Sequence, residues 1–250
     1  MTHVLVIGMS HAIALAKAAS GAVPGRVTYE IVNLHDAPRL YDRKTKALKL
    51  GGRSWERPDL VCMALEGNHH NTFSLLHTKQ KFRLGDAELG AVPAGAGQEG
   101  GDLPFVPRDM LKAAFRRALG RLDRLTETIQ AHFPGARFVH LCSPPPVLAM
   151  RPMPGPEDLP PDYNEMLYYL DFAACPPALR MRIFQVQAEI YAELAARHGS
   201  VFLAPPAQAL TADGFLDSAH WDFDPTHGNA RYGALVLAQI EAMLGQEVSA

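Results

Sequence analysis

The chain has 250 residues, 48% hydrophobic and 20% charged, with a formal net charge of −2. These values predict a single folded domain over residues 1–250 and exclude a disordered chain, while the lack of a basic excess speaks against nucleic acid and anionic membrane partners. Three cysteines do not make a disulfide framework, and neither a signal peptide nor a membrane-spanning run is visible, so the sequence predicts a cytoplasmic protein.

Short apolar runs alternate with helical patterns along the whole chain. Such runs are typical of strands in a parallel sheet that is covered on both faces. The alternation predicts a doubly wound α/β fold: a three-layer α/β/α sandwich with a five-stranded parallel sheet. The expected strands are His3–Ile7, Val27–Leu34, Leu60–Leu65, Arg137–Cys142 and Val201–Ala204, and the expected helices are His11–Ala19, Arg108–Phe133, Pro177–His198 and Asn229–Leu244.

Two stretches, near residues 69–107 and 143–177, resist assignment and are predicted to be loop insertions. The first becomes rich in glycine and proline, and the second carries aromatic residues among its prolines. Ligand clefts of open α/β sheets lie at the carboxyl ends of strands, which both insertions follow. They either wall a binding site or are ordinary surface insertions. The aromatic residues are Tyr163, Tyr168, Tyr169 and Phe172.

The first residue with a chemical interpretation is Ser10. It stands two residues after Gly8, where the first strand ends and a helix begins. Backbone N–H groups and the dipole at a helix N-terminus stabilise a nearby oxyanion, which suits a nucleophile. The competing interpretation is that Ser10 only caps the helix.

A second pattern, Asp224-Pro225-Thr226-His227, directly precedes the last predicted helix. A carboxylate three residues before a histidine can accept the imidazole Nδ1 proton within one turn, as the acid of a catalytic triad does. Asn229 is expected to cap the helix that follows. The competing interpretation is a loop aspartate beside a surface histidine.

A third pattern, Gly67-Asn68-His69-His70-Asn71, follows the third strand. The amide of Asn68 can donate to an oxyanion, or it can simply shape a turn. The adjacent histidines do not match a known ligand pattern, so no metal is expected. Gly51 and Gly52, after the second strand, either offer a backbone N–H to the same anion or form a turn.

Taken in chain order, the four patterns are a serine after the first strand, a glycine after the second, an asparagine after the third and Asp-x-x-His before the last helix. This order resembles the SGNH hydrolases, also called GDSL-like esterases, over nearly the whole chain. The resemblance implies a flavodoxin-like fold and a serine hydrolase without a cofactor. It implies Ser10 as nucleophile, His227 as base and Asp224 as its partner. It implies an oxyanion hole built from Ser10, Gly52 (or Gly51) and Asn68.

The sequence departs from the family pattern at two places. The usual Gly-Asp-Ser is here Gly8-Met9-Ser10, followed by His11 in place of leucine. The usual Gly-x-Asn-Asp is here Glu66-Gly67-Asn68-His69, so the glycine is shifted, and Asn71 is a second candidate donor.

The sequence therefore predicts an esterase that hydrolyses a small-molecule ester, either an O-acetyl sugar or a short-chain acyl ester, through an acyl-enzyme. An acyltransferase with the same triad and a non-catalytic ligand-binding relative remain alternatives. An ordinary α/β-hydrolase is rejected because its serine follows several strands. A dinucleotide-binding domain, for which Asp36 is suitably placed, lacks two glycines of the Gly-x-Gly-x-x-Gly fingerprint.

Overall fold

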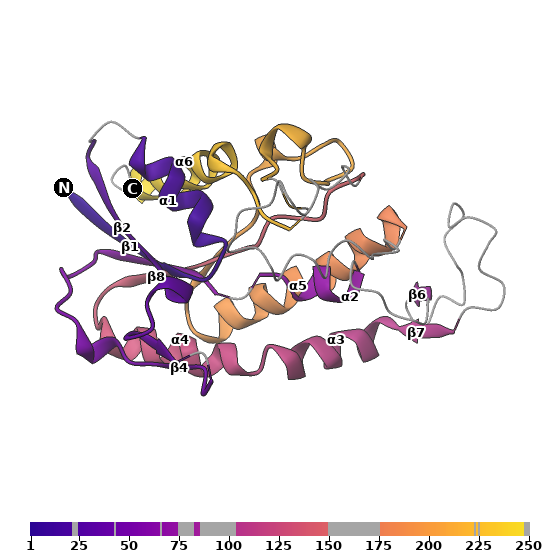
Figure 1. Cartoon of the computed structure of the whole chain (residues 1–250), viewed down its shortest axis with the longest axis horizontal. Helices are drawn as coiled ribbons and strands as arrows, with labels where there is room; N and C mark the ends of the chain where they lie inside the picture. Colours follow the sequence, from indigo (N-terminus) through magenta and orange to yellow (C-terminus); the bar gives the residue numbers. More distant parts are fainter. Residues whose placement is uncertain are drawn as a thin grey trace, which may run out of the picture.

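The computed structural model contains a five-stranded parallel sheet in the order β2-β1-β5-β8-β9 (Figure 1). Its strands are β1 (Thr2–Gly8), β2 (Val27–Asn33), β5 (Leu60–Ala64), β8 (Arg137–Leu141) and β9 (Val201–Leu203). Strand β1 pairs along its length with β2 and from Val4 onward with the central strand β5. This sheet confirms the predicted fold class, and it is the flavodoxin-like order, in which ligands bind where the strand order reverses.

The structure describes residues 1–21, 25–42, 44–65, 67–74, 83–85, 104–149, 176–222, 224 and 226–247. The aromatic residues 163–172 of the second predicted insertion, and most of the first, lie outside these ranges. Within the described ranges, no helix combines the length and apolarity needed to cross a bilayer.

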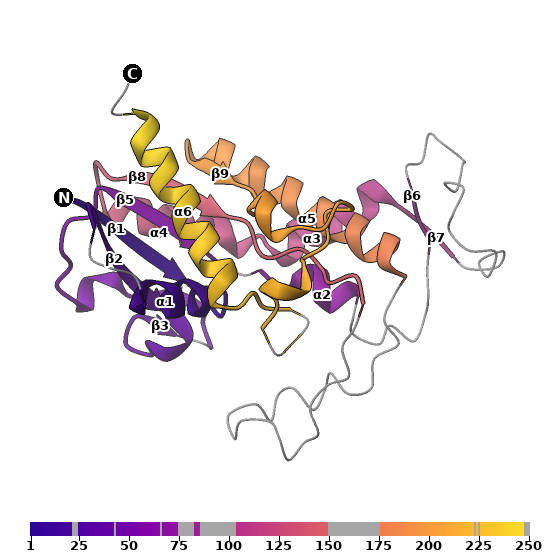
Figure 2. The ribbon, with the colours of Figure 1, turned by 90° about the horizontal axis from the view of Figure 1, so that it is seen from above.

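Helices cover both faces of the sheet and complete the three predicted layers (Figures 1 and 2). One face carries α1 (Ala12–Ser20) and α6 (Ala230–Glu247), which pack closely on each other. The other face carries α3 (Arg108–Ala118), α4 (Arg121–His132) and α5 (Pro177–Arg197). Each face has its own apolar cluster against the sheet.

Shorter elements lie around the ends of the strands. After β5 the chain forms the short helix α2 (His69–Ser74), which packs against α5. Two small ladders also form: the antiparallel pair β3 (Tyr41–Asp42) and β4 (Ala47–Leu48), and the parallel pair β6 (Arg83–Gly85) and β7 (Phe105–Pro107). Single-turn 3₁₀ helices occur at Leu34–Asp36, Leu50–Gly52, Ala207–Ala209 and Ser218–His220.

One predicted helix is in fact two helices, so that prediction is wrong. The pattern over 108–133 predicts one helix, whereas the structure ends α3 at Ala118 and begins α4 at Arg121. Gly120, a poor helix former, lies in the break. Leu119 and Leu122 are both buried there, so the break lets two successive turns direct apolar side chains into the core.

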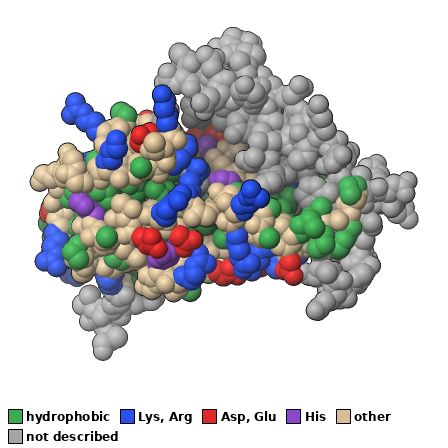
Figure 3. Space-filling model, turned by 90° about the horizontal axis from the view of Figure 1, so that it is seen from below, with side chains coloured by type: hydrophobic (Ala, Val, Ile, Leu, Met, Phe, Trp, Pro, Cys, Tyr) green, Lys and Arg blue, Asp and Glu red, His purple; other side chains and the backbone are tan. Residues whose placement is uncertain are grey.

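The face of the molecule drawn in Figure 3 carries Lys and Arg side chains interspersed with Asp and Glu. Charged side chains also pair between α3 and α5: Lys112 lies 2.6 Å from Glu193, and Arg116 lies 2.8 Å from the same carboxylate. The prediction that nucleic acid is not a partner stays a prediction.

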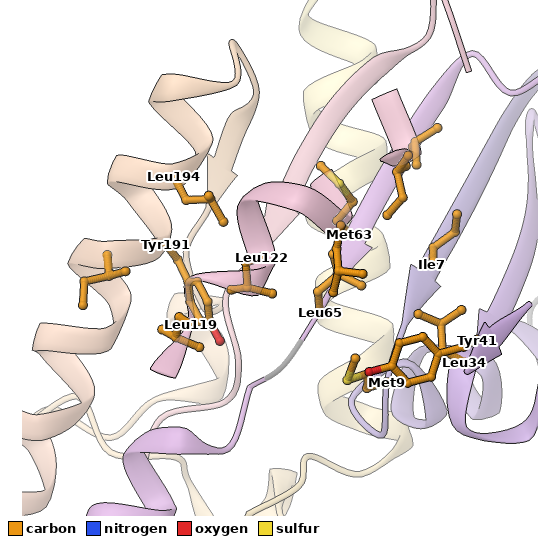
Figure 4. Packing of buried hydrophobic residues seen from close by; sticks show 14 of the residues in the cluster. Ile7, Met9, Leu34, Tyr41, Met63, Leu65, Leu119, Leu122, Tyr191 and Leu194 are labelled. Carbon is orange, nitrogen blue, oxygen red and sulfur yellow. The ribbon is translucent and has the colours of Figure 1, made fainter. Parts of the chain in front are cut away.

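The apolar core extends to the carboxyl ends of the strands. Figure 4 shows Ile7, Leu34, Tyr41 and Met63 packed together with Met9, which is 7% exposed. Met9 occupies the position where the family pattern has aspartate, and here it anchors the turn before Ser10 in the core. The turn that carries the predicted nucleophile is therefore fixed by packing.

Candidate active site

Ser10 lies on a tight turn between β1 and α1. The turn is closed by bonds from Met9 N–H to Ala64 C=O (3.1 Å) and from Ala12 N–H to Met9 C=O (2.9 Å). A side chain at Gly8 would place its Cβ 2.7 Å from the Cβ of Ala64, so only glycine allows the two strands to approach this closely. The sharp turn brings Ser10 to the edge of the sheet, half-buried.

The interpretation of Ser10 as a helix cap is wrong. The cap position of α1 is His11, and no side chain bonds to the first turn of the helix. Among the described residues, the backbone N–H groups of Ser10 and His11 donate to no carbonyl. The serine hydroxyl is thus not used in capping, and two N–H groups remain open at the positive end of the helix.

Asp224 and His227 form the predicted pair within one turn. His227 Nδ1 lies 2.7 Å from Asp224 Oδ2. The other carboxylate oxygen accepts bonds from the backbone N–H groups of Thr226 (2.6 Å) and His227 (3.0 Å) and from the Thr226 hydroxyl (2.6 Å). Because the carboxylate can only accept, the proton of the neutral imidazole is assigned to Nδ1. His227 Nε2 then carries the lone pair that a general base requires.

The environment of Asp224 keeps its carboxylate ionised. The side chain is 1% exposed, and burial by itself would raise its pKa. The hydrogen bond and charge interaction with His227, together with the bonds from Thr226, outweigh burial and lower the pKa of Asp224 below its ordinary value. A charged partner is therefore present to orient the imidazole and stabilise its protonated form.

Asn229, between His227 and α6, holds the start of this helix as the sequence predicts. Asn229 Oδ1 accepts from the N–H groups of Arg231 (2.9 Å) and Tyr232 (3.2 Å), which confirms its expected role as the cap of α6. Its amide nitrogen donates to the carbonyls of Ala219 and Trp221. Both ends of the loop that carries His227 are thereby fixed.

Asn68 lies directly beside this base. Its Nδ2 atom is 3.4 Å from His227 Nε2, although the two residues are 159 positions apart in the chain. Asn71, the second candidate donor, is 3% exposed, and its buried Oδ1 atom has no hydrogen-bond partner in the described part of the chain. The structure therefore brings Asn68 to the predicted base.

His11 connects the serine turn to the same place. Its ring centroid lies 5.1 Å from that of His227, with the planes tilted by 46°. Burial, and then the neighbouring His227, lower the pKa of His11 well below its ordinary value, so the ring is neutral. Among the described residues, no hydrogen bond joins the Ser10 hydroxyl to His227. Such bonds often form only in the substrate complex.

The predicted contribution of Gly51 or Gly52 stays a prediction. Both glycines are exposed in the 3₁₀ turn after β4. The Gly52 N–H donates to the carbonyl of Lys49 at 3.4 Å, so it closes the local turn. Asp36, which a dinucleotide site needs for ribose, instead accepts a bond from Asn33 Nδ2 at 2.6 Å.

Sequence reasoning missed several buried polar residues around the site. Thr226 bonds the acid, and its hydroxyl lies 2.9 Å from His227 Nδ1. Gln187 is fully buried on α5 and bonds the loop that contains Asn68. The one signal for Gln187 was a polar residue inside an apolar helical stripe. Within the described ranges, no group of three His, Cys, Asp or Glu side chains is arranged to hold a metal.

No protein-family model matches the chain, and no curated protein matches it in sequence. Solved structures resemble it along nearly its full length. An extracellular lipase from Streptomyces rimosus has a TM-score of 0.47 and 14% identity, covering 96% of this chain and 99% of the lipase.

Two further solved structures show the same degree of likeness. A GDSL-like lipase from Bacteroides thetaiotaomicron has a TM-score of 0.46 and 12% identity, covering 98% of this chain and 89% of its own. An aryl esterase from M. smegmatis has a TM-score of 0.42 and 12% identity, covering 98% and 99%. At these values, the activity of this chain has to be argued from its own site.

Proposed function

We propose that the chain is a serine esterase of the SGNH hydrolase family. The observation that carries the proposal is the arrangement around His227: its Nδ1 atom is bonded to a buried carboxylate at 2.7 Å, and its Nε2 atom faces a side-chain amide at 3.4 Å. Base, acid and amide donor come from two distant segments. They meet beside the turn that carries Ser10, whose neighbour His11 packs near the base.

The chemistry follows from these positions. His227 Nε2 takes the proton of the Ser10 hydroxyl as its oxygen attacks the ester carbonyl carbon. The carbonyl oxygen becomes an anion, which the Asn68 amide and the N–H groups at the start of α1 stabilise. The protonated imidazole, held by Asp224, then gives its proton to the leaving alcohol as the ester bond breaks. An acyl group remains on Ser10, and a water activated by the same base releases it as a carboxylic acid.

The substrate class we propose is a small ester, an O-acetyl sugar or a short-chain acyl ester. Neither reaction step needs a cofactor, because base, acid and anion stabilisation all come from the chain. An aryl acetate is a suitable first substrate, since its good leaving group places few demands on the alcohol side of the site.

The proposal is tested with a fluorophosphonate probe, which reacts covalently with activated serines, together with hydrolysis of an aryl acetate. The wild-type protein should be labelled and active, and Ser10→Ala should be neither, because no other group replaces the nucleophile. Ser20→Ala is the matched control: this serine lies on the same helix, and its hydroxyl donates to the Lys17 carbonyl at 2.9 Å. A wild-type protein that is folded but neither labelled nor active would support a ligand-binding role instead.

A further inference from the structure

The loop that carries Asn68 is held by a side chain from a distant helix. Gln187, 0% exposed at the middle of α5, accepts a bond at Oε1 from the backbone N–H of His70 (2.7 Å). Its Nε2 atom donates to the backbone carbonyl of Gly67 (2.8 Å). The two backbone partners flank Asn68 and His69. One amide side chain therefore satisfies the backbone on both sides of the proposed donor.

The same amide ties this loop to the next strand. Gln187 Nε2 also donates to the hydroxyl of Ser143, two residues beyond the end of β8, at 3.2 Å. The Gln187 amide thus makes three hydrogen bonds, all to segments at the carboxyl edge of the sheet. A buried amide without partners would destabilise the fold, so its complete pairing indicates a specific fit between α5 and these loops.

A second side chain closes the loop from within. His70 is 0% exposed, and its Nδ1 atom lies 3.1 Å from the carbonyl of Gly67, which can only accept. The proton is therefore assigned to Nδ1. The ring packs edge-on against Phe184 of α5, at 5.1 Å between centroids. Burial lowers the pKa of His70 to about 4, so the ring is neutral at pH 7.

Close packing leaves the loop no room to shift. A Cβ atom at Gly67 would lie 2.0 Å from His11 Nε2 and 2.7 Å from the Cβ of Ser143. The glycine that the family places one residue earlier thus stands here where His11 and Ser143 press against the backbone. Helix α2, which follows, has only six residues. The loop depends on its neighbours for rigidity.

We infer that Gln187 is a positioning residue for the oxyanion donor Asn68. The inference rests on the proposed function, because it assigns Gln187 a role in the same site. A preorganised donor stabilises the transition state only while its amide stays aimed at the developing anion. Gln187 fixes the backbone before and after Asn68 and so fixes the origin of that side chain. Without the Gln187 side chain, the Asn68 amide is no longer held toward the developing anion, while substrate contacts elsewhere remain.

The test is Gln187→Met, which keeps length and volume but forms none of the three bonds. A displacement of about 1 Å at a reacting group costs roughly 10²-fold in rate, so kcat should fall about 10–100-fold while KM changes less than about twofold. The double variant with Asn68→Ala should be no slower than Asn68→Ala alone, because Gln187 acts through Asn68. Losses that multiply would overturn the inference.

Gln130→Met is the matched control. Gln130 makes the same kind of bonds, from Nε2 to the carbonyl of His198 (2.9 Å) and the hydroxyl of Ser200 (3.2 Å), but it lies on α4. Its kcat should stay within about twofold of wild type. A loss in Gln130→Met equal to that in Gln187→Met would show that any missing glutamine impairs the fold, and would overturn the specific role.

A readout without catalysis separates the two proposals. Hydrogen exchange of the His70 amide should accelerate in Gln187→Met, since its acceptor is gone. Faster exchange with an unchanged kcat overturns the positioning role but leaves the esterase intact. A wild-type protein whose Ser10 is inert in the probe experiment overturns the proposed function itself.

If Gln187→Met does not fold, Ser143→Ala replaces it: removing one of the three bonds should lower kcat about 3–10-fold, again without adding to the loss in Asn68→Ala.

Discussion

At the residue scale, two asparagines are candidates for the oxyanion donor. Asn68 Nδ2 lies 3.4 Å from His227 Nε2, whereas Asn71 is buried within the first turn of α2. Asn68→Ala should lower kcat by about 10²–10³ and change KM little, because the contact forms mainly in the transition state. Asn71→Ala should affect kcat much less. Steady-state kinetics on an aryl acetate measures both, and the reverse ranking would assign the role to Asn71.

A second prediction concerns Asp224. Its carboxylate accepts the Nδ1 proton of His227 and so leaves Nε2 as the base. In Asp224→Asn the new amide can donate to Nδ1, which moves the imidazole proton to Nε2, where it blocks attack. We expect kcat to fall by roughly 10³–10⁴ with the fold retained. Circular dichroism checks the fold, and an active variant would remove Asp224 from the mechanism.

The contact between Asp224 and His227 could be predicted from the sequence because it depends on local spacing. The catalytic roles of Ser10, Asp224 and His227 stay predictions. The sequence did not identify Gln187 or Thr226. Gln187 acts on residues more than a hundred positions away, at Gly67 and His70, and no local pattern marks that pairing. The role of the Thr226 hydroxyl follows only from the positions of the Asp224 and His227 side chains in the folded chain.

At the element scale, strands were easier to predict than breaks between helices. Buried parallel strands are nearly continuous apolar runs, so all five appeared in the sequence within a few residues of their observed ends. The break at Gly120 was missed because Leu119 and Leu122 continue the apolar spacing of both helices. Spacing alone does not distinguish one long helix from two that share a face.

Helix α5 is attached to its surroundings by two kinds of polar contact, which should differ in strength. Arg180, 2% exposed, donates to the carbonyls of Val147 (2.6 Å) and Leu148 (2.7 Å). Glu193 pairs with Lys112 and Arg116 at the surface. Arg180→Met should lower the free energy of unfolding by about 1–3 kcal/mol, since it removes the charged donor from the buried carbonyl of Val147.

Glu193→Gln is the comparison variant for that prediction. Surface ion pairs contribute at most about 1 kcal/mol, because water and salt screen them. Urea unfolding of both variants measures the difference. Equal losses would mean that the carbonyls at 147 and 148 find other partners when the guanidinium is removed.

At the scale of the whole molecule, buried neutral histidines couple stability to pH. Burial lowers the pKa of His70 and of His140 from 6.5 to about 4, and it lowers that of His11 as well. Between pH 6.5 and 4 the unfolded chain binds protons that the folded chain does not, so the folded state loses stability as the pH falls. Asp224, whose pKa is lowered, stabilises the folded state above its ordinary pKa of 3.8 and loses this effect only at lower pH.

His140 allows this coupling to be tested away from the active site. It lies on β8, an interior strand of the sheet, and is 4% exposed; its buried Nε2 atom has no hydrogen-bond partner among the described residues. Burial, then the charge of His198, lowers its pKa to about 4, while Asp123 opposes the shift. A pKa that falls from 6.5 to about 4 corresponds to about 3 kcal/mol of stability lost on acidification through that window.

His140→Leu, similar in volume, should therefore retain more stability than wild type at pH 4.5 and show a smaller advantage at pH 7.5. Urea unfolding at both values measures the difference, with His132→Gln, at a half-buried position, as the histidine control. Parallel pH dependence in His140→Leu and wild type would mean that His140 takes up no proton when the chain unfolds.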